Sequence, residues 1–533
     1  MAASTSRDDF QVSDDDFEQL SNEGSVTDID ITSDSSSDGE YDPSTQQMPV
    51  WNINTSGLRR IPFSGVSGLR VPVPGNDPAD YFFLLLDDVF LESIVRETNK
   101  YALKTFCGPE TTPQSRITRW KDITVEELKI FLGLMIHTGT IRINRLQDYW
   151  KTDEMFDLKY FRKHMSRDRF MLILRCLHFS HHDEDNTENR LHKVQPVIDY
   201  FNQKMKDVYY PSKELSIDEA LMLWRGRLVF RQYIQNKRHR YGIKFYCLNE
   251  PQGLTMNVLV YNGANDQQVG GKGHASKVVM KLMRGYLDKG HSLYMDNYYN
   301  SFLLSAQLLA NCTYSTGTLQ KNRLFLPEEV TKANLQRGET IQRYAEGICV
   351  GKWKDKRDVL YISSEHENTM AVCHNRFGQP RNKPLPIIQY NAYMKGVDRS
   401  DQMLSYYPCE RKTLRWYKKV FFHFIQLILV NGWVLNNQIN NDRLPLYDFR
   451  LRVIKALIPQ DLQRPIQVST KKRPCHVLSK NEERDAKGIR KRKRCRMCSK
   501  EKKRTSTVYY CPQCPDKPSL CPVRCFDLYH ESM

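Results

Sequence analysis

The sequence lacks a long apolar run and a secretory leader. Hydrophobic residues make up 40% of its 533 residues, but no stretch approaches the roughly 20 uninterrupted apolar residues that a membrane-spanning helix needs. The best candidate, residues 420–434, carries His423, Gln426 and Asn431. The first residues are small and acidic, unlike the basic and then apolar start of a signal peptide. These absences predict a soluble, intracellular protein with no membrane partner.

The sequence also lacks the cysteine distribution of a disulfide framework. Six of its 14 cysteines fall in the last 39 residues, and the others are scattered singly. Clustering of this kind is typical of a metal-binding module in a reducing compartment.

Acidic residues are concentrated at the N-terminus. Residues 1–45 hold 13 acidic residues against one basic residue, Arg7, so the net charge of +17 for the whole chain leaves about +29 on the remainder. A basic body of this size attracts polyanions, of which nucleic acid is the commonest. The alternative, that Lys and Arg only solvate the surface, stays open at this point.

Residues 1–75 have too little apolar content to offset the entropy of ordering the chain. We therefore predict that this acidic, Ser-rich region is disordered. Whether it regulates the protein or only keeps it in solution is left open by its composition.

Apolar spacing predicts helices on both sides of a β-rich centre. Residues 79–103 have the spacing of an amphipathic helix, and Thr124-Val125-Glu126-Glu127 matches a capping box that opens a second helix. Further helices are predicted within 150–210 and over 385–404 and 416–436. Short β-rich runs separated by Gly or Asn lie between them, at 215–218, 241–248, 254–261 and 291–295.

Four aspartates stand in or beside these predicted elements. Asp218 closes the first β-rich run and Asp296 follows the last one, while Asp398 and Asp401 are three residues apart, which places both on one face of a helix. Phosphodiester cleavage by two Mg²⁺ ions needs such carboxylates, because hard cations take oxygen ligands. An aspartate after a strand is also a common turn former, so spacing alone leaves both interpretations open.

The sequence words around these aspartates resemble those of the piggyBac transposase superfamily, in the family's order and approximate spacing from about Trp120 to the C-terminus. The matching words are Leu215-Ser216-Ile217-Asp218-Glu219, Trp224-Arg225-Gly226-Arg227, Lys237 with Tyr241-Gly242-Ile243-Lys244, Met295-Asp296-Asn297-Tyr298-Tyr299-Asn300-Ser301, Gly317-Thr318, and Met394-Lys395-Gly396-Val397-Asp398 through Asp401-Gln402-Met403.

This resemblance implies an RNase H-like catalytic core. In it Asp218, Asp296 and Asp398 would be the ligands of catalytic Mg²⁺ (or Mn²⁺), and Asp401 matches a fourth catalytic acidic position. The resemblance also implies a cut-and-paste DNA transposase that nicks transposon ends, forms hairpin intermediates and joins the ends to TTAA targets. The alternative is a domesticated nuclear DNA-binding protein that keeps the fold without cleaving DNA.

A cationic run with an embedded aromatic pair, residues 411–419, can hold phosphates while a ring stacks on an unpaired base. The same pattern fits the start of a helix whose Trp416 belongs to the core, and the resemblance favours DNA. Gln320 stands where family members often carry a basic residue, and Lys321 and Arg323 are the candidates to replace it. The predicted DNA contacts are Arg225, Arg227, Lys321, Arg323, Arg411, Lys412, Arg415 and Trp416.

The C-terminus carries two CxxC pairs followed by further Cys and His, a spacing typical of zinc sites. Six Cys and His530 supply seven ligands, and two complete tetrahedral sites need an eighth. The family's His at this place favours His476, and Cys475 is the competing choice. The predicted ligands of two structural Zn²⁺ ions are His476, Cys495, Cys498, Cys511, Cys514, Cys521, Cys525 and His530. Lys471-Lys472-Arg473 and the basic run 490–494 also suit a nuclear localisation signal, so we expect a nuclear protein.

The predicted fold class is an α/β RNase H-like core with an insertion, flanked by an all-α domain and a small cross-brace zinc finger. Joining two transposon ends requires at least a homodimer on double-stranded DNA. The predicted order is a disordered acidic region (1–75), a helical dimerisation and DNA-binding domain (76–213 and 409–464), a catalytic domain (214–322 and 386–408) split by an insertion (323–385), a basic linker (465–475) and a Cys-rich zinc-binding domain (476–533).

Overall fold

The computed structural model describes residues 48–55, 57–106, 117, 120–180, 189–234, 240–264, 266–374, 378–440, 443–459, 476, 478–486, 488–501, 503–522 and 524–531. Several predictions fall outside these residues, so their structure is not described. They are the disorder of residues 1–47, the linker at 465–475 with its basic triplet, the candidate ligand Cys475, and Lys237.

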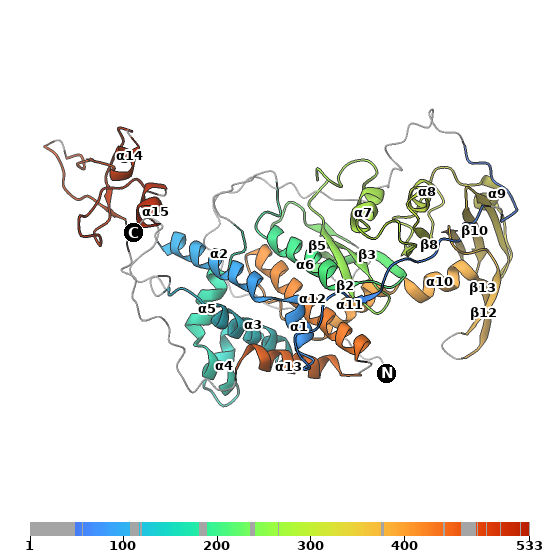
Figure 1. Ribbon diagram of the computed structural model, residues 1–533, viewed down its shortest axis with the longest axis horizontal. Coiled ribbons are helices and arrows are strands. Elements are labelled where there is room, and N and C mark those ends of the chain that lie inside the picture. The colour runs from blue at the N-terminus through green and yellow to red at the C-terminus, as the bar shows by residue number, and fades with distance from the viewer. Residues whose placement is uncertain are drawn as a thin grey trace, which may run out of the picture.

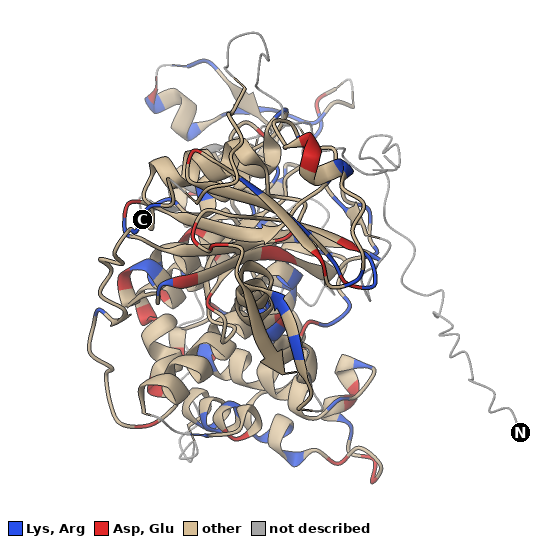
Figure 2. Ribbon diagram, turned by 90° about the vertical axis from the view of Figure 1, so that its right-hand side faces the viewer, with Lys and Arg blue, Asp and Glu red and all other residues tan. Residues whose placement is uncertain are grey.

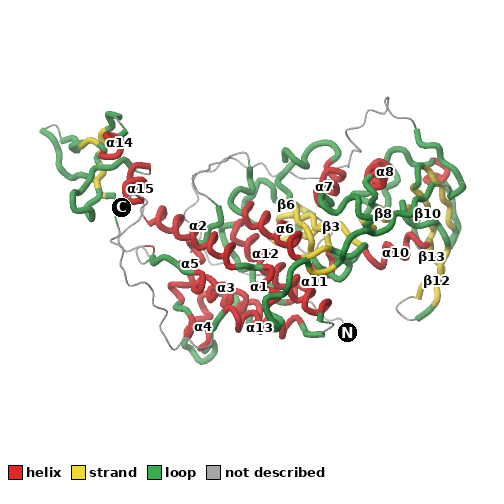
Figure 3. The backbone as a smooth tube through the Cα atoms, in the orientation of Figure 1, coloured by secondary structure: helices red, strands yellow, loops and turns green. Residues whose placement is uncertain are grey.

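Helices form one half of the body (Figures 1 and 3). The predicted helix over 79–103 is two helices: the first ends at Leu85, and the Asp87 Oδ1 accepts a hydrogen bond of 2.8 Å from the backbone N–H of Phe90 in the first turn of the next. The capping box prediction is confirmed, since the Thr124 hydroxyl accepts from the backbone N–H of Glu127 at 3.2 Å. The helices of this half are α1 (Asp80–Leu85), α2 (Asp88–Phe106), α3 (Val125–Thr140), the 3-10 helix η3 (Leu146–Trp150), α4 (Lys159–His164), α5 (Arg167–Cys176), α6 (Gln195–Val208), α12 (Trp416–Ile439) and α13 (Leu446–Leu457).

Helix α12 is the centre of this half. It is long and apolar enough to cross a membrane by length and composition, but 83% of its most apolar window is buried inside the protein, as is typical of a core helix. Its polar residues are used internally: the Asn431 side chain accepts from the backbone N–H of Thr255 at 3.0 Å and donates to the carbonyl of Thr255 at 2.8 Å. Asn431, one of the polar residues that interrupt this apolar stretch, therefore attaches the helix to the sheet.

One mixed sheet forms the other half, with strand order β4-β5-β3-β7-β8-β11-β10-β9 and β6 paired to β5. The hairpin strands β3, β5 and β6 are antiparallel, whereas β3, β7 and β8 run parallel. All four predicted β-rich runs are strands. The strands are β3 (Glu214–Leu223), β4 (Gln232–Tyr233), β5 (Tyr241–Asn249), β6 (Thr255–Val260), β7 (Ser292–Met295), β8 (Tyr314–Thr318), β9 (Thr340–Ala345), β10 (Ile348–Lys354) and β11 (Asp358–Ser363).

Helices cover both faces of the sheet. On one face Tyr246 of β5 meets His274 of α7 (His274–Leu282), with 2.7 Å between the Tyr246 hydroxyl and the His274 Nε2. The Ser315 hydroxyl of β8 donates to the Ser305 hydroxyl of α8 (Phe302–Ala310) at 2.9 Å. The opposite face is covered by α10 (Leu385–Tyr393) and α11 (Gly396–Tyr406). The single helix predicted over 385–404 is therefore two.

The predicted insertion continues the central sheet. Strand β11 pairs antiparallel with β8, and β10 and β9 follow outward. The short helix α9 (Glu328–Lys332) packs against β9 and β10, and a separate hairpin of β12 (Met370–His374) and β13 (Pro380–Pro384) leads into α10. Figure 2 looks onto this end of the molecule and shows Lys and Arg interspersed with Asp and Glu along its strands.

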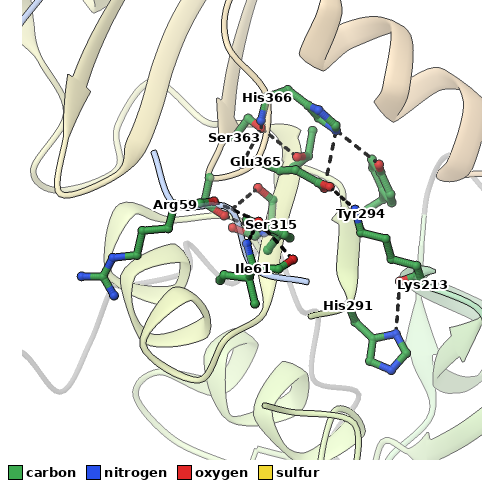
Figure 4. Close-up of polar contacts among 12 residues, drawn as sticks. Arg59, Ile61, Lys213, His291, Tyr294, Ser315, Ser363, Glu365 and His366 are labelled. Carbon is green, nitrogen blue, oxygen red and sulfur yellow. Dashed lines mark hydrogen bonds and ion pairs between the residues drawn. The ribbon is translucent and has the colours of Figure 1, made fainter. Parts of the chain in front are cut away.

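An ion pair connects the start of β3 to the segment after β11. The Lys213 ammonium lies 2.5 Å from the Glu365 carboxylate, and within that segment the His366 backbone N–H donates to the Ser363 hydroxyl at 2.9 Å (Figure 4). Strand segments about 150 residues apart in sequence are thereby held at one edge of the sheet.

The prediction of disorder up to residue 75 is wrong for residues 48–55 and 57–75, which form an ordered strap along the sheet (Figures 1 and 4). Asn52 forms an antiparallel bridge with Tyr344 of β9, and the Tyr314 hydroxyl donates to the carbonyl of Arg59 at 2.9 Å. Further along, β1 (Gly68–Leu69) pairs with β2 (Tyr209–Tyr210). The segment is ordered because its few apolar side chains pack against the body of the protein. The Trp51 ring, for example, lies 5.4 Å from that of Phe302 in an edge-on contact.

This packing predicts that the strap stabilises the sheet. Trp51→Ala should lower the free energy of unfolding by about 2 kcal/mol, less than for a fully buried aromatic ring. The neighbouring Val50→Ala is the control, because Val50 is 76% exposed and should change stability little. Urea denaturation of both variants measures the difference, and equal stability of the two would contradict a packed strap.

Candidate functional site

Asp218 and Asp296 lie beside each other on adjacent parallel strands. The ladder pairs Ile217 of β3 with Met295 of β7, and each of these residues is followed by one of the aspartates. Neighbouring strands are roughly 4.8 Å apart, so the two carboxylates leave the sheet side by side. Spacing in the sequence did not reveal this neighbourhood, because it depends on the strand order.

The loop after Asp296 is held by the side-chain amide of Asn300 and by the close approach of β8 to the end of β7. The Asn300 side-chain amide donates to the carbonyls of Met295, Asp296 and Thr318 at 2.8, 3.1 and 3.0 Å. A Cβ on Gly317 would lie 1.8 Å from the Met295 carbonyl oxygen, which explains why only glycine fits there. The two sequence motifs around Asp296 and Gly317 thus form one joint, in which the end of β7 is fixed to the end of β8.

Helix α11 brings Asp398 to the same face. A Cβ on Gly396 would lie 2.5 Å from the carbonyl oxygen of Glu250 and 2.6 Å from the Ser216 hydroxyl. The glycine therefore lets the start of α11 rest directly on β3. Two residues later Asp398 stands in the first turn with its side chain exposed.

Tyr390 is a residue of this site that we did not predict. It lies in the last turn of α10, is largely buried, and is hydrogen-bonded to the Thr318 side chain. The carboxylates of Asp296, Asp218 and Asp398 all act on its hydroxyl, and together with burial they raise the pKa of Tyr390 to about 12. One hydroxyl thus lies within electrostatic reach of all three predicted metal ligands. No motif in the sequence singled out this tyrosine.

Glu219 follows Asp218 in β3 and is a largely buried acid whose side chain is hydrogen-bonded to that of Asp218. Its carboxylate accepts from the Tyr299 hydroxyl at 2.7 Å and lies 3.3 Å from the Lys244 ammonium. Burial and the negative charge of Glu219 raise the pKa of Asp296 to about 6. The site therefore concentrates negative charge, which a divalent cation would relieve.

Asp401 lies on α11, like Asp398, but it lines a small cavity between β5, α11 and α12. Cys247 and His423 also line this cavity. Among the described residues, two groups of possible metal ligands have all their ligand atoms within 4.8 Å of one another. Both groups consist of Cys and His and contain no aspartate. The aspartates are more widely spaced. The oxygen ligands that the aspartates offer fit hard cations such as Mg²⁺.

The predicted DNA contacts separate into exposed and internal side chains. Arg225, Arg227, Lys321, Lys412 and Arg415 are exposed. In contrast, the buried Arg323 guanidinium donates to the carbonyls of Asn297 and Tyr298 at 3.2 and 2.5 Å, so it holds the loop after Asp296.

The cationic run 411–419 is likewise partly structural. Arg411 donates to the carbonyls of Ile143 and Thr138 at 2.9 and 2.5 Å, and the Trp416 ring lies 5.2 Å from that of Phe230, edge to face. The alternative that this run belongs to the protein core therefore holds for Arg411 and Trp416.

All eight predicted zinc ligands fall into two sets of four. One set is His476, Cys511, Cys514 and His530, and the other is Cys495, Cys498, Cys521 and Cys525. The sets alternate along the chain, which is the cross-braced arrangement. The sequence alone did not determine this division.

Distances within the sets suit tetrahedral coordination. A Zn–S bond of about 2.3 Å places two sulfurs of a tetrahedron roughly 3.8 Å apart, and the Cys498 Sγ lies 3.9 Å from that of Cys521 and 3.5 Å from that of Cys525. In the other set, 2.7 Å separate the His530 Nδ1 from the Phe526 carbonyl oxygen. That hydrogen bond leaves Nε2 free as the ligand atom.

Comparisons with known proteins agree on one family. A family model described as Transposase IS4 matches residues 77–433, and one described as a DDE_Tnp_1-like zinc finger matches residues 472–531. PiggyBac transposable element-derived protein 3 of Homo sapiens is 25% identical over 407 residues, which cover 72% of this chain and 66% of that protein. Protein 2 of the same series, also from Homo sapiens, is 26% identical over 379 residues, covering 67% and 61%. The chain thus spans just under two thirds of these relatives.

A solved structure has the same fold. The piggyBac transposase in a synaptic complex with hairpin DNA superposes with a TM-score of 0.65 at 24% identity, covering 86% of this chain and 98% of that one.

The two Cys and His sets predict two zinc ions per chain. Cys498→Ser and Cys514→Ser should each lose at least one ion, because each removes a ligand from a different set. Cys312→Ser is the control, since Cys312 is an exposed cysteine outside both sets. Elemental analysis of purified protein measures the stoichiometry, and retention of two ions by Cys498→Ser would contradict the assignment.

Proposed function

The chain belongs to the piggyBac superfamily of transposases, and from this membership we propose that it is an active, metal-dependent cut-and-paste DNA transposase. The observation that carries the proposal is the meeting of Asp218, Asp296 and Asp398 on one sheet face, around the Tyr390 hydroxyl. These carboxylates would be the ligands of the catalytic ions.

The sheet order supports an RNase H-like core. Its strands, counted along the chain as β3, β5, β6, β7 and β8, lie in the order third, second, first, fourth, fifth. The first strand is central and carries Asp218, the end of the fourth carries Asp296, and a helix packed on the first strand carries Asp398. This is the placement that the resemblance implies for catalytic acids.

The chain's own groups have distinct roles in the proposed reaction. Asp218, Asp296 and Asp398 would hold two Mg²⁺ ions, and such ions would supply Lewis-acid chemistry for phosphodiester cleavage. Asn300 and Arg323 hold the Asp296 loop in place through its carbonyls. Glu219 and Lys244 set the charge beneath the site. Asp401 acts from the neighbouring cavity, as a positioning acid.

Double-stranded DNA is the proposed substrate, with transposon ends joined to TTAA targets through hairpin intermediates. The exposed Arg225, Arg227, Lys412 and Arg415 are available to its phosphates, which are the usual partners of such side chains. A homodimer would bring two ends together, and the basic run 490–494 would direct the protein to the nucleus.

Excision from a reporter that carries the element's own ends tests this function. Wild type should restore an intact target site, and Asp218→Asn, Asp296→Asn and Asp398→Asn should each reduce excision at least 100-fold, because each loses a metal ligand. Asp448→Asn is the control, since Asp448 is an exposed aspartate of α13. If wild type binds the ends but does not excise, the chain is a DNA-binding protein without cleavage activity.

The raised pKa of Asp296, about 6, predicts a pH-dependent cation affinity. A carboxyl group binds a cation in its ionised form, and below pH 6 most of Asp296 is protonated. Affinity for Mn²⁺ should therefore fall about tenfold between pH 7 and pH 5. Calorimetric titration of the zinc-loaded protein measures it. Asp296→Asn should bind more weakly with less dependence on pH, and wild-type affinity that is equal at both pH values would contradict the prediction.

A further inference from the structure

The last turn of α10 places a phenol among the catalytic carboxylates. Helix α10 packs across β8, β7 and β3 on the face that carries Asp218 and Asp296. Its Tyr390 side chain is hydrogen-bonded to the Thr318 side chain. Thr318 directly follows Gly317, which pairs with Met295, so this hydrogen bond lies next to Asp296.

The surroundings of this hydroxyl are unusual because they are acidic on several sides. Asp296, Asp218 and Asp398 are the charged groups that act on it, and they come from two strands and a helix. A tyrosine with an ordinary pKa near 10 is neutral at pH 7. The site therefore holds a neutral O–H donor between carboxylates that can only accept hydrogen bonds when ionised.

We propose that Tyr390 is a further catalytic residue, whose hydroxyl donates a hydrogen bond to a non-bridging oxygen of the scissile phosphate. The inference rests on the proposed function, because it requires a phosphodiester at the three aspartates. The Tyr390 hydroxyl shares a hydrogen bond with the Thr318 hydroxyl, and each hydroxyl can both donate and accept. When Thr318 donates in this pair, the phenol proton is available to a phosphate oxygen bound at the three aspartates.

Donation differs from nucleophilic attack in where the phenol proton goes. A tyrosine that attacks phosphorus must first lose its proton to a base, and its oxygen must be free of other bonds. The Tyr390 oxygen is hydrogen-bonded to the Thr318 side chain. In the proposed role Tyr390 keeps its proton, and no covalent link between protein and DNA forms.

Thr318 is a positioning residue for this donor. Its backbone carbonyl is bound by the Asn300 amide at 3.0 Å, and its side chain bonds to Tyr390. The phenol is thus oriented by the same joint that fixes Asp296. A donor held in advance at the place where charge develops needs little reorganisation during the reaction.

Tyr390→Phe tests the proposal while keeping the ring and its packing. Tyr393→Phe is the matched control, because Tyr393 lies one turn further along α10, with its ring 5.1 Å from that of Tyr294. Single-turnover cleavage of an end duplex should be about 10- to 100-fold slower for Tyr390→Phe, as for loss of one transition-state donor. The control should cleave at the wild-type rate, and both variants should bind the duplex and Mn²⁺ within about twofold of wild type.

A phosphorothioate at the cleaved position separates this role from indirect effects. Sulfur is a weaker acceptor than oxygen, so one of the two sulfur diastereomers should slow wild type more than it slows Tyr390→Phe. An equal effect on both proteins, or a Tyr390→Phe defect that saturating Mn²⁺ repairs, would overturn the proposal. Failure of wild type to cleave any duplex would instead contradict the proposed function.

Discussion

The amide of Asn300 and the missing side chain of Gly317 set the geometry on which the candidate site depends. Parallel strands that end together leave carbonyl groups without ladder partners, and each unpaired buried carbonyl costs free energy. Asn300 satisfies three such groups at the ends of β7 and β8. The two strands can approach so closely because position 317 has no Cβ. Asp296, Thr318 and, through Thr318, Tyr390 all take their positions from this joint.

The helical half supports the sheet through polar contacts as well as through its core. Asn431, in the middle of the most apolar helix, bonds to both backbone groups of Thr255. The Lys418 ammonium donates to the carbonyls of Leu174 and Arg175 at 2.8 and 2.6 Å, which are in the last turn of α5. Buried polar side chains of this kind specify how two layers meet, because apolar contact alone allows them to slide.

Local signals in the sequence predicted local structure well. The Thr124 cap, the four β-rich runs and helix α12 were all predicted, since each depends on neighbouring residues. Predictions failed where distant parts of the chain decide the outcome. Gly396 begins a second helix, α11, at the point where its backbone lies against β3, and residues 48–55 and 57–75 are ordered because Trp51 and Arg59 have partners in α8 and β8.

The same distinction applies to the site. The sequence motifs predicted the aspartates and the Cys and His residues that the structure gathers into two sets, but they did not predict how those Cys and His residues divide between the sets. Arg411 and Arg323 have the charge of DNA contacts, yet both bind carbonyls inside the protein. Charge identifies a residue that can bind phosphate, and only the fold decides whether it faces one. Tyr390 could not be predicted because its role depends on strand register.

The position of the insertion also has a consequence for the timing of synthesis. All of β9, β10, β11 and the hairpin β12–β13 separate Asp296 from Asp398 along the chain. A growing polypeptide that has already folded β3 and β7 still lacks the third carboxylate. In the proposed function, cleavage that needs all three acids would have to wait until the ribosome has completed the insertion and α11. Prematurely terminated products that end before Asp398 would then lack part of the proposed site.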